Sequence, residues 1–313
     1  MFTKNFKQLS KNDTGIAGGK GASLGEMINN KIPVPPGVVV LANSFDKFLE
    51  ETDLDVEIEA ILKKVKYKDI NSVEMASEEI KDLILDTEFS KDIAQEIQKE
   101  FAKLKAKYVA VRSSATAEDS SIASWAGELE SYLNTTKENL LENVKKCWAS
   151  LFTPRAIFYR FEKKLHKQKV SVAVVVQKMI QSEISGITFT VHPVTQDRNQ
   201  MIIEAGYGLG EAIVGGKITP DAYVIHKNDK TILDKNISEQ KMMIIRNKNG
   251  IKGASVPKSK QNQQKLTDKQ ILELSKICIN IEKHYRKPQD IEWAFEKGKF
   301  YIVQSRPITT LQN

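Results

Sequence analysis

The spacing of apolar residues changes near residue 170, and this change limits the fold of the 313-residue chain more than any other feature. Before it, apolar residues recur at intervals of three and four, which indicates amphipathic helices. After it, short apolar or alternating runs indicate strands. Helices and strands do not alternate regularly, so a doubly wound parallel sheet is disfavoured. We predict an α+β chain of two lobes, residues 1–175 and 176–313.

The periodicity predicts individual elements as well. We expect helices at residues 43–51, 54–68, 73–86, 91–105, 137–152, 154–167 and 268–285. Thr153 has the side chain of an N-cap, and Pro154 suits the first helical position of the helix that follows. We expect strands at residues 108–113, 172–180, 186–191, 201–205, 222–226, 241–246, 290–296 and 300–305.

Composition limits the class of protein. Hydrophobic residues make up 41% and charged residues 28% of the chain, a balance typical of globular proteins. No run of 18 apolar residues is present and the first residues do not resemble a signal peptide, so we expect no membrane span and no secretion. Cys147 and Cys278 each lie in a segment with helical periodicity, which predicts buried free thiols. We therefore expect a cytoplasmic protein.

The net charge of +7 favours anionic partners: nucleic acid, an acidic protein or a phosphate-bearing small molecule. Much of the excess is lysine scattered through residues 47–107 and 227–269, without the interleaved arginine and aromatic residues of a single-strand-binding surface. We expect no nucleic-acid partner. The four histidines, His166, His192, His226 and His284, have no metal-ligand spacing, and we interpret them as structural or surface residues.

Residues 15–25 hold five glycines around Lys20. Glycines let a backbone approach a phosphate closely, and a lysine adds a mobile positive charge. The segment is neither a P-loop nor a dinucleotide fingerprint, because Thr14 and Gly21 stand where the P-loop needs glycine and a hydroxyl side chain, and Leu24 replaces the last fingerprint glycine. Phosphate contact by Lys20 and a flexible turn before a helix both remain open.

Arg112 lies at the end of a strand expected to be buried. A buried guanidinium needs an anion, and its planar fork suits phosphate oxygens. The structural alternative is an ion pair with Glu118 or Asp119.

The last two expected strands form a hairpin. If Lys297-Gly298-Lys299 is a three-residue loop, Glu292 faces Gln304 and Asp290 faces Arg306, all four on one face of the pair. Tyr301 and Val303 then share the other face with Ile291, Trp293 and Phe295, and a two-residue turn would break this alignment. A carboxylate beside an amide oxygen suits Mg²⁺, and an adjacent arginine would complete a clamp for metal and polyphosphate. The alternative is a solvated polar strand face.

Gln177 ends an apolar strand at the expected junction of the lobes, where a backbone edge could pair with an adenine ring. A plain core strand is the alternative. The glycines of residues 206–211 match neither a dinucleotide fingerprint nor a P-loop, so a turn is sufficient to explain them.

Together these motifs resemble the nucleotide-binding domain of the dikinase family, which includes pyruvate, water dikinase (phosphoenolpyruvate synthase), pyruvate phosphate dikinase and rifampicin phosphotransferase. The matching stretches occur in family order at residues 18–27, 34–37, 111–115, 125–127, 151–156, 175–179, 208–211, 219–221, 290–293 and 304–307. The resemblance implies an ATP-grasp fold, in which two α+β lobes clasp ATP with Mg²⁺, the second lobe carrying the metal-binding hairpin.

The resemblance also implies roles for single residues. It implies that Lys20, Arg112 and Arg306 bind and polarise the polyphosphate as catalytic residues, that Glu292 and Gln304 hold the metal, and that Asp290 supports them. It places Gln177 on the adenine side, and Gly127 with Ser131 in a loop over the phosphates.

In complete dikinases a histidine on a separate domain carries the phosphoryl group, and no histidine of this chain lies in such a setting. The resemblance therefore implies a phosphotransferase domain that cleaves ATP to AMP and phosphate. The β-phosphate passes to a histidine on a carrier domain, in cis or in trans. Pyruvate is the final acceptor of the phosphoryl group. The alternative is the nucleotide-binding domain of a rifampicin phosphotransferase or of pyruvate phosphate dikinase. A free-standing ligase and a non-catalytic nucleotide-sensing protein are further alternatives.

Overall fold

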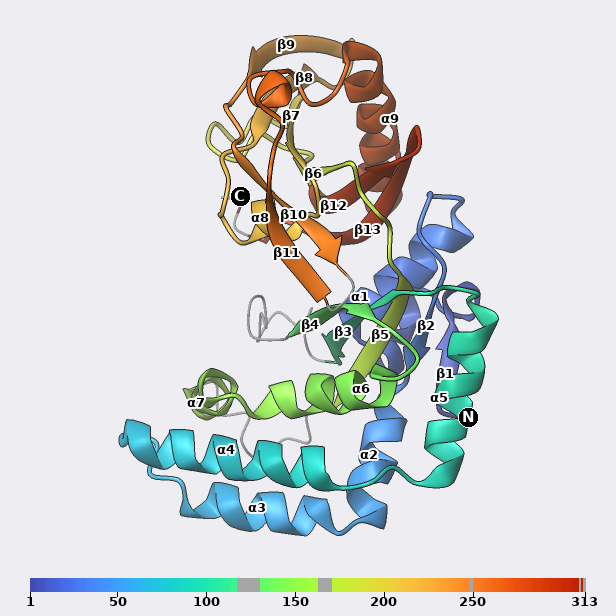
Figure 1. Ribbon diagram of the computed structural model, residues 1–313, viewed down its shortest axis with the longest axis vertical. Coiled ribbons are helices and arrows are strands. Elements are labelled where there is room, and N and C mark those ends of the chain that lie inside the picture. The colour runs from blue at the N-terminus through green and yellow to red at the C-terminus, as the bar shows by residue number, and fades with distance from the viewer. Residues whose placement is uncertain (117–129, 163–170, 248–249, 310, 312–313) are drawn as a thin grey trace. The chain divides into compact units, whose positions relative to one another are not determined.

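The computed structural model describes residues 1–116, 130–162, 171–247, 250–309 and 311. The chain divides into two compact units (Figure 1). Unit 1 consists of Met1–Glu26 and Pro36–Met179, and unit 2 of Met27–Pro35 and Ile180–Asn313. The strand expected at 172–180 is β5, Val172–Lys178, and it lies wholly in unit 1. Both units mix helices with antiparallel sheet, as predicted for an α+β chain.

The sheet of unit 1 has the strand order β1-β2-β5-β3-β4, and each neighbouring pair is antiparallel. Its strands are β1 (Thr3–Asn5), β2 (Gly37–Val40), β3 (Val109–Ala115), β4 (Ser131–Thr135) and β5. β5 is central and buried almost throughout, so its unbroken run of apolar residues reflects two covered faces.

Helices cover this sheet in layers (Figure 1). α6 packs on β3 and β5, α4 packs on α6, and α3 packs on α4. Their bounds are α2 (Ala42–Glu51), α3 (Leu54–Lys64), α4 (Ile70–Asp86), α5 (Lys91–Lys103), α6 (Leu140–Ala149) and α7 (Pro154–Glu162). The Thr153 hydroxyl accepts the N–H of Ala156 and caps α7, as predicted.

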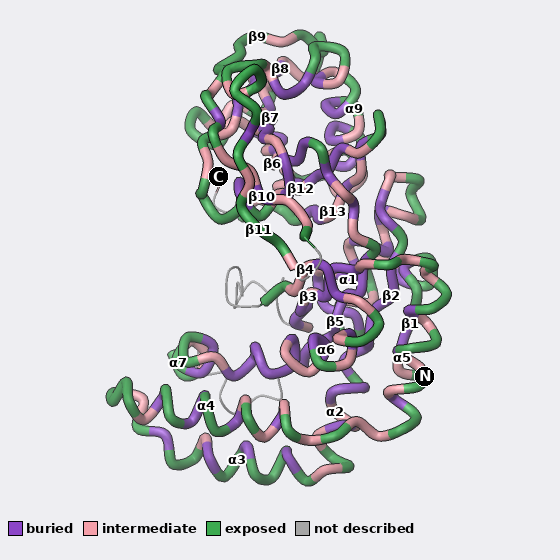
Figure 2. Tube along the Cα trace, viewed as in Figure 1, coloured by how far each residue is buried: buried purple, intermediate pink, exposed green. Residues whose placement is uncertain are grey.

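Trp148 on α6 is the largest buried side chain of this core. Its ring lies 5.4 Å from that of Phe45, 5.1 Å from that of Phe48 and 5.1 Å from that of Phe89. Figure 2 shows how buried residues follow α6 and β5, whereas exposed residues predominate along α3. Aromatic packing thus joins α2 and α6 over the sheet.

The sheet of unit 2 has six antiparallel strands in the order β13-β12-β6-β7-β8-β9. They are β6 (Ile184–Phe189), β7 (Gln200–Tyr207), β8 (Asp221–His226), β9 (Thr231–Asn236), β12 (Gln289–Glu296) and β13 (Lys299–Pro307). The helix α9 (Asp268–Tyr285) packs against β9 and β12, and its buried residues include Cys278. The antiparallel order agrees with the rejection of a doubly wound sheet.

Shorter elements complete unit 2. The strands β10 (Met242–Asn247) and β11 (Gly250–Ser255) form a separate antiparallel pair, and α8 (Glu211–Val214) follows β7. Among the described residues, 3-10 helices lie at Phe6–Gln8, Lys11–Asp13 and Ser150–Phe152 in unit 1 and at Lys258–Lys260 in unit 2.

Both cysteines are buried free thiols, as predicted, and burial raises the pKa of each, that of Cys278 to about 12. A search of the described residues found no helix with the length and apolar character needed to cross a membrane.

Candidate functional site

The hairpin of β12 and β13 places four of the predicted site residues in two cross-strand pairs. Glu292 is paired with Gln304, and Asp290 with Arg306. Residues directly opposite each other share a face of the sheet, and Asp290 and Glu292 alternate with the buried Ile291 and Trp293. This pairing agrees with the predicted register.

The turn that produces this register differs from the predicted three-residue loop. Glu296 pairs with Lys299, so only Lys297 and Gly298 connect the strands. Both have positive φ, 50° and 78°, as the tight hairpin turns require. The outer part of the hairpin still has Glu292 opposite Gln304, because the register shifts at a bulge between Glu292 and Trp293.

The bulge also corrects the predicted apolar face. Trp293 pairs with Ile302 and Phe295 with Phe300, whereas Tyr301 lies opposite Ala294. Ile302 and Phe300 are buried, so they take the places that the three-residue loop would have given to Val303 and Tyr301. Val303 is the additional residue of the bulge.

Asp290 and Arg306 are joined by hydrogen bonds as well as by register. Nε and Nη2 of Arg306 both donate to Oδ2 of Asp290, at 2.9 and 2.8 Å. The Asp290 side chain is 14% exposed and that of Arg306 is 49% exposed. Burial raises the pKa of Asp290, the guanidinium opposes that rise, and the charge of Glu292 adds to it. The carboxylate is therefore held next to a cation that can still reach solvent.

A further carboxylate, Glu204 on β7, belongs to the same face of the sheet. Glu292 pairs with Ile187 on β6, and Ile187 pairs with Glu204, so one row across the sheet contains both glutamates. Burial, and to a smaller extent the charge of Asp290, raises the pKa of Glu204. Glu204 was not among the site residues predicted from the sequence. The sequence does show a charged residue inside an otherwise alternating apolar strand. It does not show that this strand lies in the same sheet as the β12–β13 hairpin, so it gave no reason to choose Glu204.

In unit 1, the glycine-rich segment consists of two helical stretches that meet at Gly18, whose backbone is not helical. It forms α1 (Thr14–Asn29), which is kinked at Gly18 with φ 67° and ψ 170°. A Cβ atom at Gly18 would lie 2.2 Å from both oxygen atoms of Ser114 on β3. The Ser114 hydroxyl donates to the carbonyl of Ala17 at 3.0 Å and accepts the N–H of Gly21 at 3.3 Å. The glycines therefore dock the helix carrying Lys20 onto the strand carrying Arg112.

Arg112 has two neighbours in the sheet. It pairs with Val175 on β5 and with Ser131 on the edge strand β4, so the structure brings together two predicted site residues. Arg112 is half-buried in a strand whose other residues are buried, and Ser131 is exposed. The alternative partners Glu118 and Asp119 lie outside the described residues, and so does Gly127.

Gln177 lies on β5 between Gly37 and Ala110 of the neighbouring strands. Its side chain is 2% exposed, and its Nε2 has no hydrogen-bond partner among the described residues. An unsatisfied buried donor is costly, and a ligand acceptor would remove that cost.

The predicted site residues thus form two groups. Lys20, Arg112, Ser131 and Gln177 belong to unit 1, and Asp290, Glu292, Gln304 and Arg306 belong to unit 2. Within the described part of the chain, no three His, Cys, Asp or Glu side chains are grouped closely enough to hold a metal ion by themselves. Glu292 and Gln304 do supply the oxygen donors that Mg²⁺ prefers when substrate phosphates and water complete its coordination.

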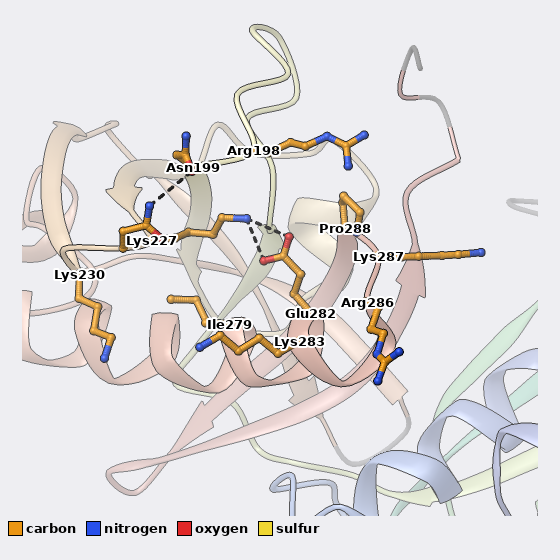
Figure 3. A pocket seen from close by; sticks show the side chains of 11 residues that line it. Arg198, Asn199, Lys227, Lys230, Ile279, Glu282, Lys283, Arg286, Lys287 and Pro288 are labelled. Carbon is orange, nitrogen blue, oxygen red and sulfur yellow. Dashed lines mark hydrogen bonds and ion pairs between the residues drawn. The ribbon is translucent and has the colours of Figure 1, made fainter.

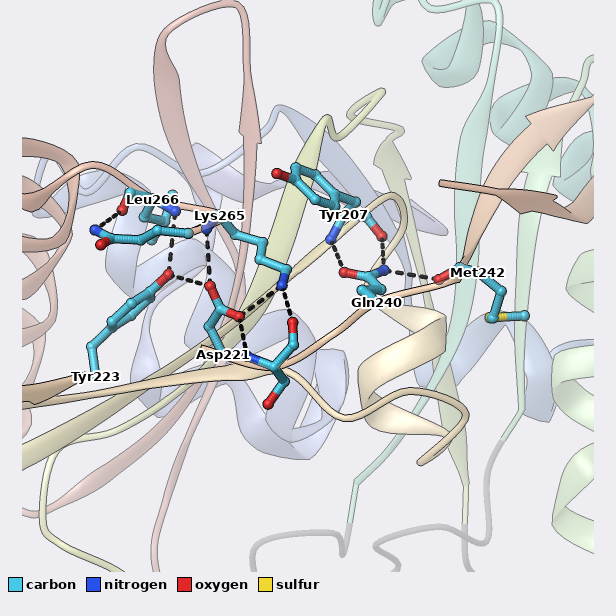
Figure 4. Close-up of polar contacts among 9 residues, drawn as sticks. Tyr207, Asp221, Tyr223, Gln240, Met242, Lys265 and Leu266 are labelled. Carbon is cyan, nitrogen blue, oxygen red and sulfur yellow. Dashed lines mark hydrogen bonds and ion pairs between the residues drawn. The ribbon is translucent and has the colours of Figure 1, made fainter. Parts of the chain in front are cut away.

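Unit 2 also contains a buried ionic network (Figure 4). The side chains of Asp221 and Lys265 are fully buried, and Lys265 Nζ lies 2.8 Å from Asp221 Oδ1. Asp221 also accepts the N–H groups of Ser238 and Lys265 and the hydroxyl of Tyr223. Burial and the Asp221 hydrogen bond raise the pKa of Tyr223. The network ties β8 to both ends of the segment that carries β10 and β11.

These features define an α+β chain of two units. One unit carries the polar face of the β12–β13 hairpin, and the other carries Lys20 on α1 and Arg112 on β3. The family profile described as "Pyruvate phosphate dikinase, AMP/ATP-binding domain" matches residues 14–313, and the chain belongs to this family.

Curated relatives agree with this assignment. The chain is 46% identical to a "Probable phosphoenolpyruvate synthase" of Methanocaldococcus jannaschii, over 99% of this chain and 27% of that protein. It is 48% identical to a protein of the same name from Archaeoglobus fulgidus, over 97% of this chain and 41% of the relative. A "Rifampicin phosphotransferase" of Bacillus subtilis is 38% identical, over 97% of this chain and 35% of the relative. The chain therefore spans less than half the length of these relatives.

Proposed function

We propose that the chain is the ATP- and Mg²⁺-binding phosphotransferase domain of a phosphoenolpyruvate synthase-like dikinase. The observation that carries the proposal is the paired arrangement of Glu292 with Gln304 and of Asp290 with Arg306 on one face of the β12–β13 hairpin. The pair of Glu292 and Gln304 supplies oxygen donors for a metal, and the neighbouring pair of Asp290 and Arg306 supplies a guanidinium for phosphate. Membership of the family supports ATP as the ligand.

The two units correspond in this proposal to the two lobes of an ATP-grasp fold, a relation that comes from the family resemblance. Lys20 and Arg112 of unit 1 and Arg306 of unit 2 bind and polarise the polyphosphate. Gln177 meets the adenine, for which its unsatisfied buried Nε2 offers a donor. Gly127 and Ser131 belong to the loop over the phosphates.

Glu292 and Gln304 would hold Mg²⁺, and Asp290 would position Arg306 beside them. When bound, the metal would neutralise negative charge on the polyphosphate oxygens. The three cationic residues then stabilise the charge that develops as the bond between the α and β phosphates breaks. A histidine nitrogen of a separate carrier domain takes the β-phosphorus as AMP leaves, and a water molecule cleaves the bond between the β and γ phosphates, which releases the γ-phosphate as inorganic phosphate and leaves the β-phosphoryl group on the histidine.

Pyruvate is the final acceptor in this proposal, reached through the carrier domain. The identities of 46% and 48% to proteins named as phosphoenolpyruvate synthases favour this acceptor over rifampicin, whose named phosphotransferase is 38% identical. We also propose a cytoplasmic location, since ATP and pyruvate are metabolites of that compartment.

A reconstitution experiment tests the division of labour. The 313-residue chain alone should form no phosphoenolpyruvate from ATP and pyruvate, because the family resemblance assigns the carrier histidine, which must lie in line with the phosphorus, to a separate domain. A carrier-and-acceptor segment from a relative, added in trans or fused to the C-terminus, should restore AMP formation and phosphorylation of its histidine. Formation of phosphoenolpyruvate by the chain alone, or stable phosphorylation of one of its own histidines, would overturn the proposal.

A further inference from the structure

A pocket of about 460 Å³ in unit 2 is lined by residues that the proposed function does not use (Figure 3). Three segments that are distant in sequence form it: the turn before β7, the turn between β8 and β9, and the C-terminal end of α9. Its lining contains six cationic side chains and one carboxylate, a formal charge of +5. The cations are Arg198, Lys227, Lys230, Lys283, Arg286 and Lys287.

The single carboxylate is already neutralised. Lys227 Nζ donates to both carboxylate oxygens of Glu282 at 2.8 Å and to the carbonyl of Thr190 at 2.7 Å. Figure 3 shows this pair at the centre of the pocket, between the loops and the helix. All three ammonium hydrogens of Lys227 therefore have acceptors, and Lys227 and Glu282 together add no net charge to the pocket.

The other five cations keep their charge. Arg198, Lys230, Lys283, Arg286 and Lys287 are all exposed, and none forms an ion pair with a described residue. Two more carboxylates lie on the same turns: Asp197 accepts the N–H of Asn199, and Asp229 lies 2.8 Å from His226 Nδ1. Neither is paired with one of the five cations, and the cations outnumber these carboxylates, so the field at the pocket is positive.

The C-terminus of α9 explains only part of this charge. A helix C-terminus favours cations, which accounts for Lys283, Arg286 and Lys287. It does not account for Arg198 and Lys230, which come from the two turns. A concave site that gathers cations from three segments is better explained by an anionic ligand.

The shape of the lining indicates which anion fits. In Figure 3 the charged ends of Arg198, Arg286 and Lys287 lie on one side of the central pair and that of Lys230 on the other, so they do not converge on one point. This spread of charged ends suits an extended row of phosphates better than a single phosphate. The lining contains no aromatic side chain, and its apolar members are Ile279 and Pro288, so a stacked base has no platform. The amides of Asn199 and Asn228 add neutral donors for oxyanions.

We propose that this pocket binds a linear polyphosphate-type anion, such as tripolyphosphate, at a site separate from the hairpin face of β12 and β13. The proposal does not depend on the proposed function of that hairpin.

The test is titration calorimetry of the full chain with sodium tripolyphosphate in the presence of EDTA. The variant Lys283→Gln/Arg286→Gln/Lys287→Gln removes three exposed cations that have no ion pairs among the described residues, so the fold should be retained. The matched control, Lys252→Gln/Lys258→Gln/Lys260→Gln, removes the same charge from exposed residues elsewhere in unit 2. The pocket variant should weaken binding about tenfold, and the control less than twofold.

A third protein, Arg306→Ala, separates this pocket from the proposed nucleotide site, and its pocket binding should persist. Equal weakening in the two triple variants would show a general charge effect, and unchanged binding in the pocket variant would show that the pocket is not used. A gel-shift assay with a single-stranded RNA 20-mer tests the alternative that the pocket binds RNA. If the pocket variant lost RNA binding but kept tripolyphosphate binding, the polyphosphate assignment would be overturned.

Discussion

Glu292 lies directly opposite Gln304 in an antiparallel pair whose two strands are joined by only two residues. A regular hairpin with that turn would place Glu292 opposite Val303, and the bulge moves the partner by one residue. The chemistry proposed for this face therefore depends on one extra residue in β13.

The hairpin predicts different effects for two similar substitutions. Glu292→Gln should weaken Mg²⁺-dependent ATP binding by at least tenfold, because it replaces a charged oxygen donor by a neutral one. Glu296→Gln, next to the turn on the same strand, should change binding less than twofold. Calorimetric titration of each variant with ATP at fixed Mg²⁺ measures both effects, and equal losses would show that the metal assignment is wrong.

The buried pair of Asp221 and Lys265 predicts a large effect on stability. Lys265→Met leaves the Asp221 carboxylate buried without its cation, and breaking such a pair costs about 3–5 kcal/mol. Lys235→Met, which removes an exposed partner of Asp268, should leave stability nearly unchanged. Urea unfolding curves compare the two. A Lys265→Met protein as stable as the wild type would contradict the network drawn in Figure 4.

Two glycines of α1 form a matched pair for a test of the kink. Gly18→Ala should destabilise unit 1 by about 2 kcal/mol or more, through a clash with Ser114 and a strained positive φ. Gly15→Ala meets no atom within 4 Å and should be neutral or slightly stabilising in a helix. Thermal melts of both variants provide the comparison, and a neutral Gly18→Ala would mean that the helix does not dock on β3 as described.

Glu96 predicts a pH-dependent contribution to stability. Burial raises its pKa, but hydrogen bonds from the Thr3 hydroxyl and the N–H groups of Phe2 and Thr3 outweigh burial and lower it below the ordinary value of 4.5. A carboxyl whose folded pKa is lowered stabilises the fold above its unfolded pKa, and this contribution is lost as the pH falls through the folded pKa. Glu96→Gln should therefore cost about 1–3 kcal/mol at pH 7 and less at pH 3. The same loss at both pH values, measured by urea unfolding, would argue against this linkage.

Much of the fold follows from local patterns in the sequence. Helical spacing located α2, α4, α5 and α9, and apolar runs located β5 and β7, because burial of one face imposes that periodicity. Short or exposed strands gave no such signal. β9 is exposed along most of its length, and β2 has only four residues.

Other features have physical causes that local patterns do not contain. The glycine-rich segment left a turn and phosphate contact by Lys20 both open, and the structure adds that Gly18 permits a close approach to Ser114, 96 residues further along the chain. The bulge at Val303 arises from the competition between a tight turn and the burial of Trp293, Phe300 and Ile302. Lys265 and Asp221 are 44 residues apart, so only the fold reveals their pairing.

Binding of ATP with Mg²⁺ by this chain can be measured by a thermal melt of the 313-residue protein with and without both ligands. A ligand that binds only the folded state stabilises it by mass action, by about 2.7 kcal/mol at a hundred times its Kd. The melting temperature should rise with ATP concentration when Mg²⁺ is present, and it should rise much less in the Arg306→Ala and Lys20→Ala variants. A folded wild-type protein whose melting temperature is unchanged by millimolar ATP and Mg²⁺ would contradict this binding.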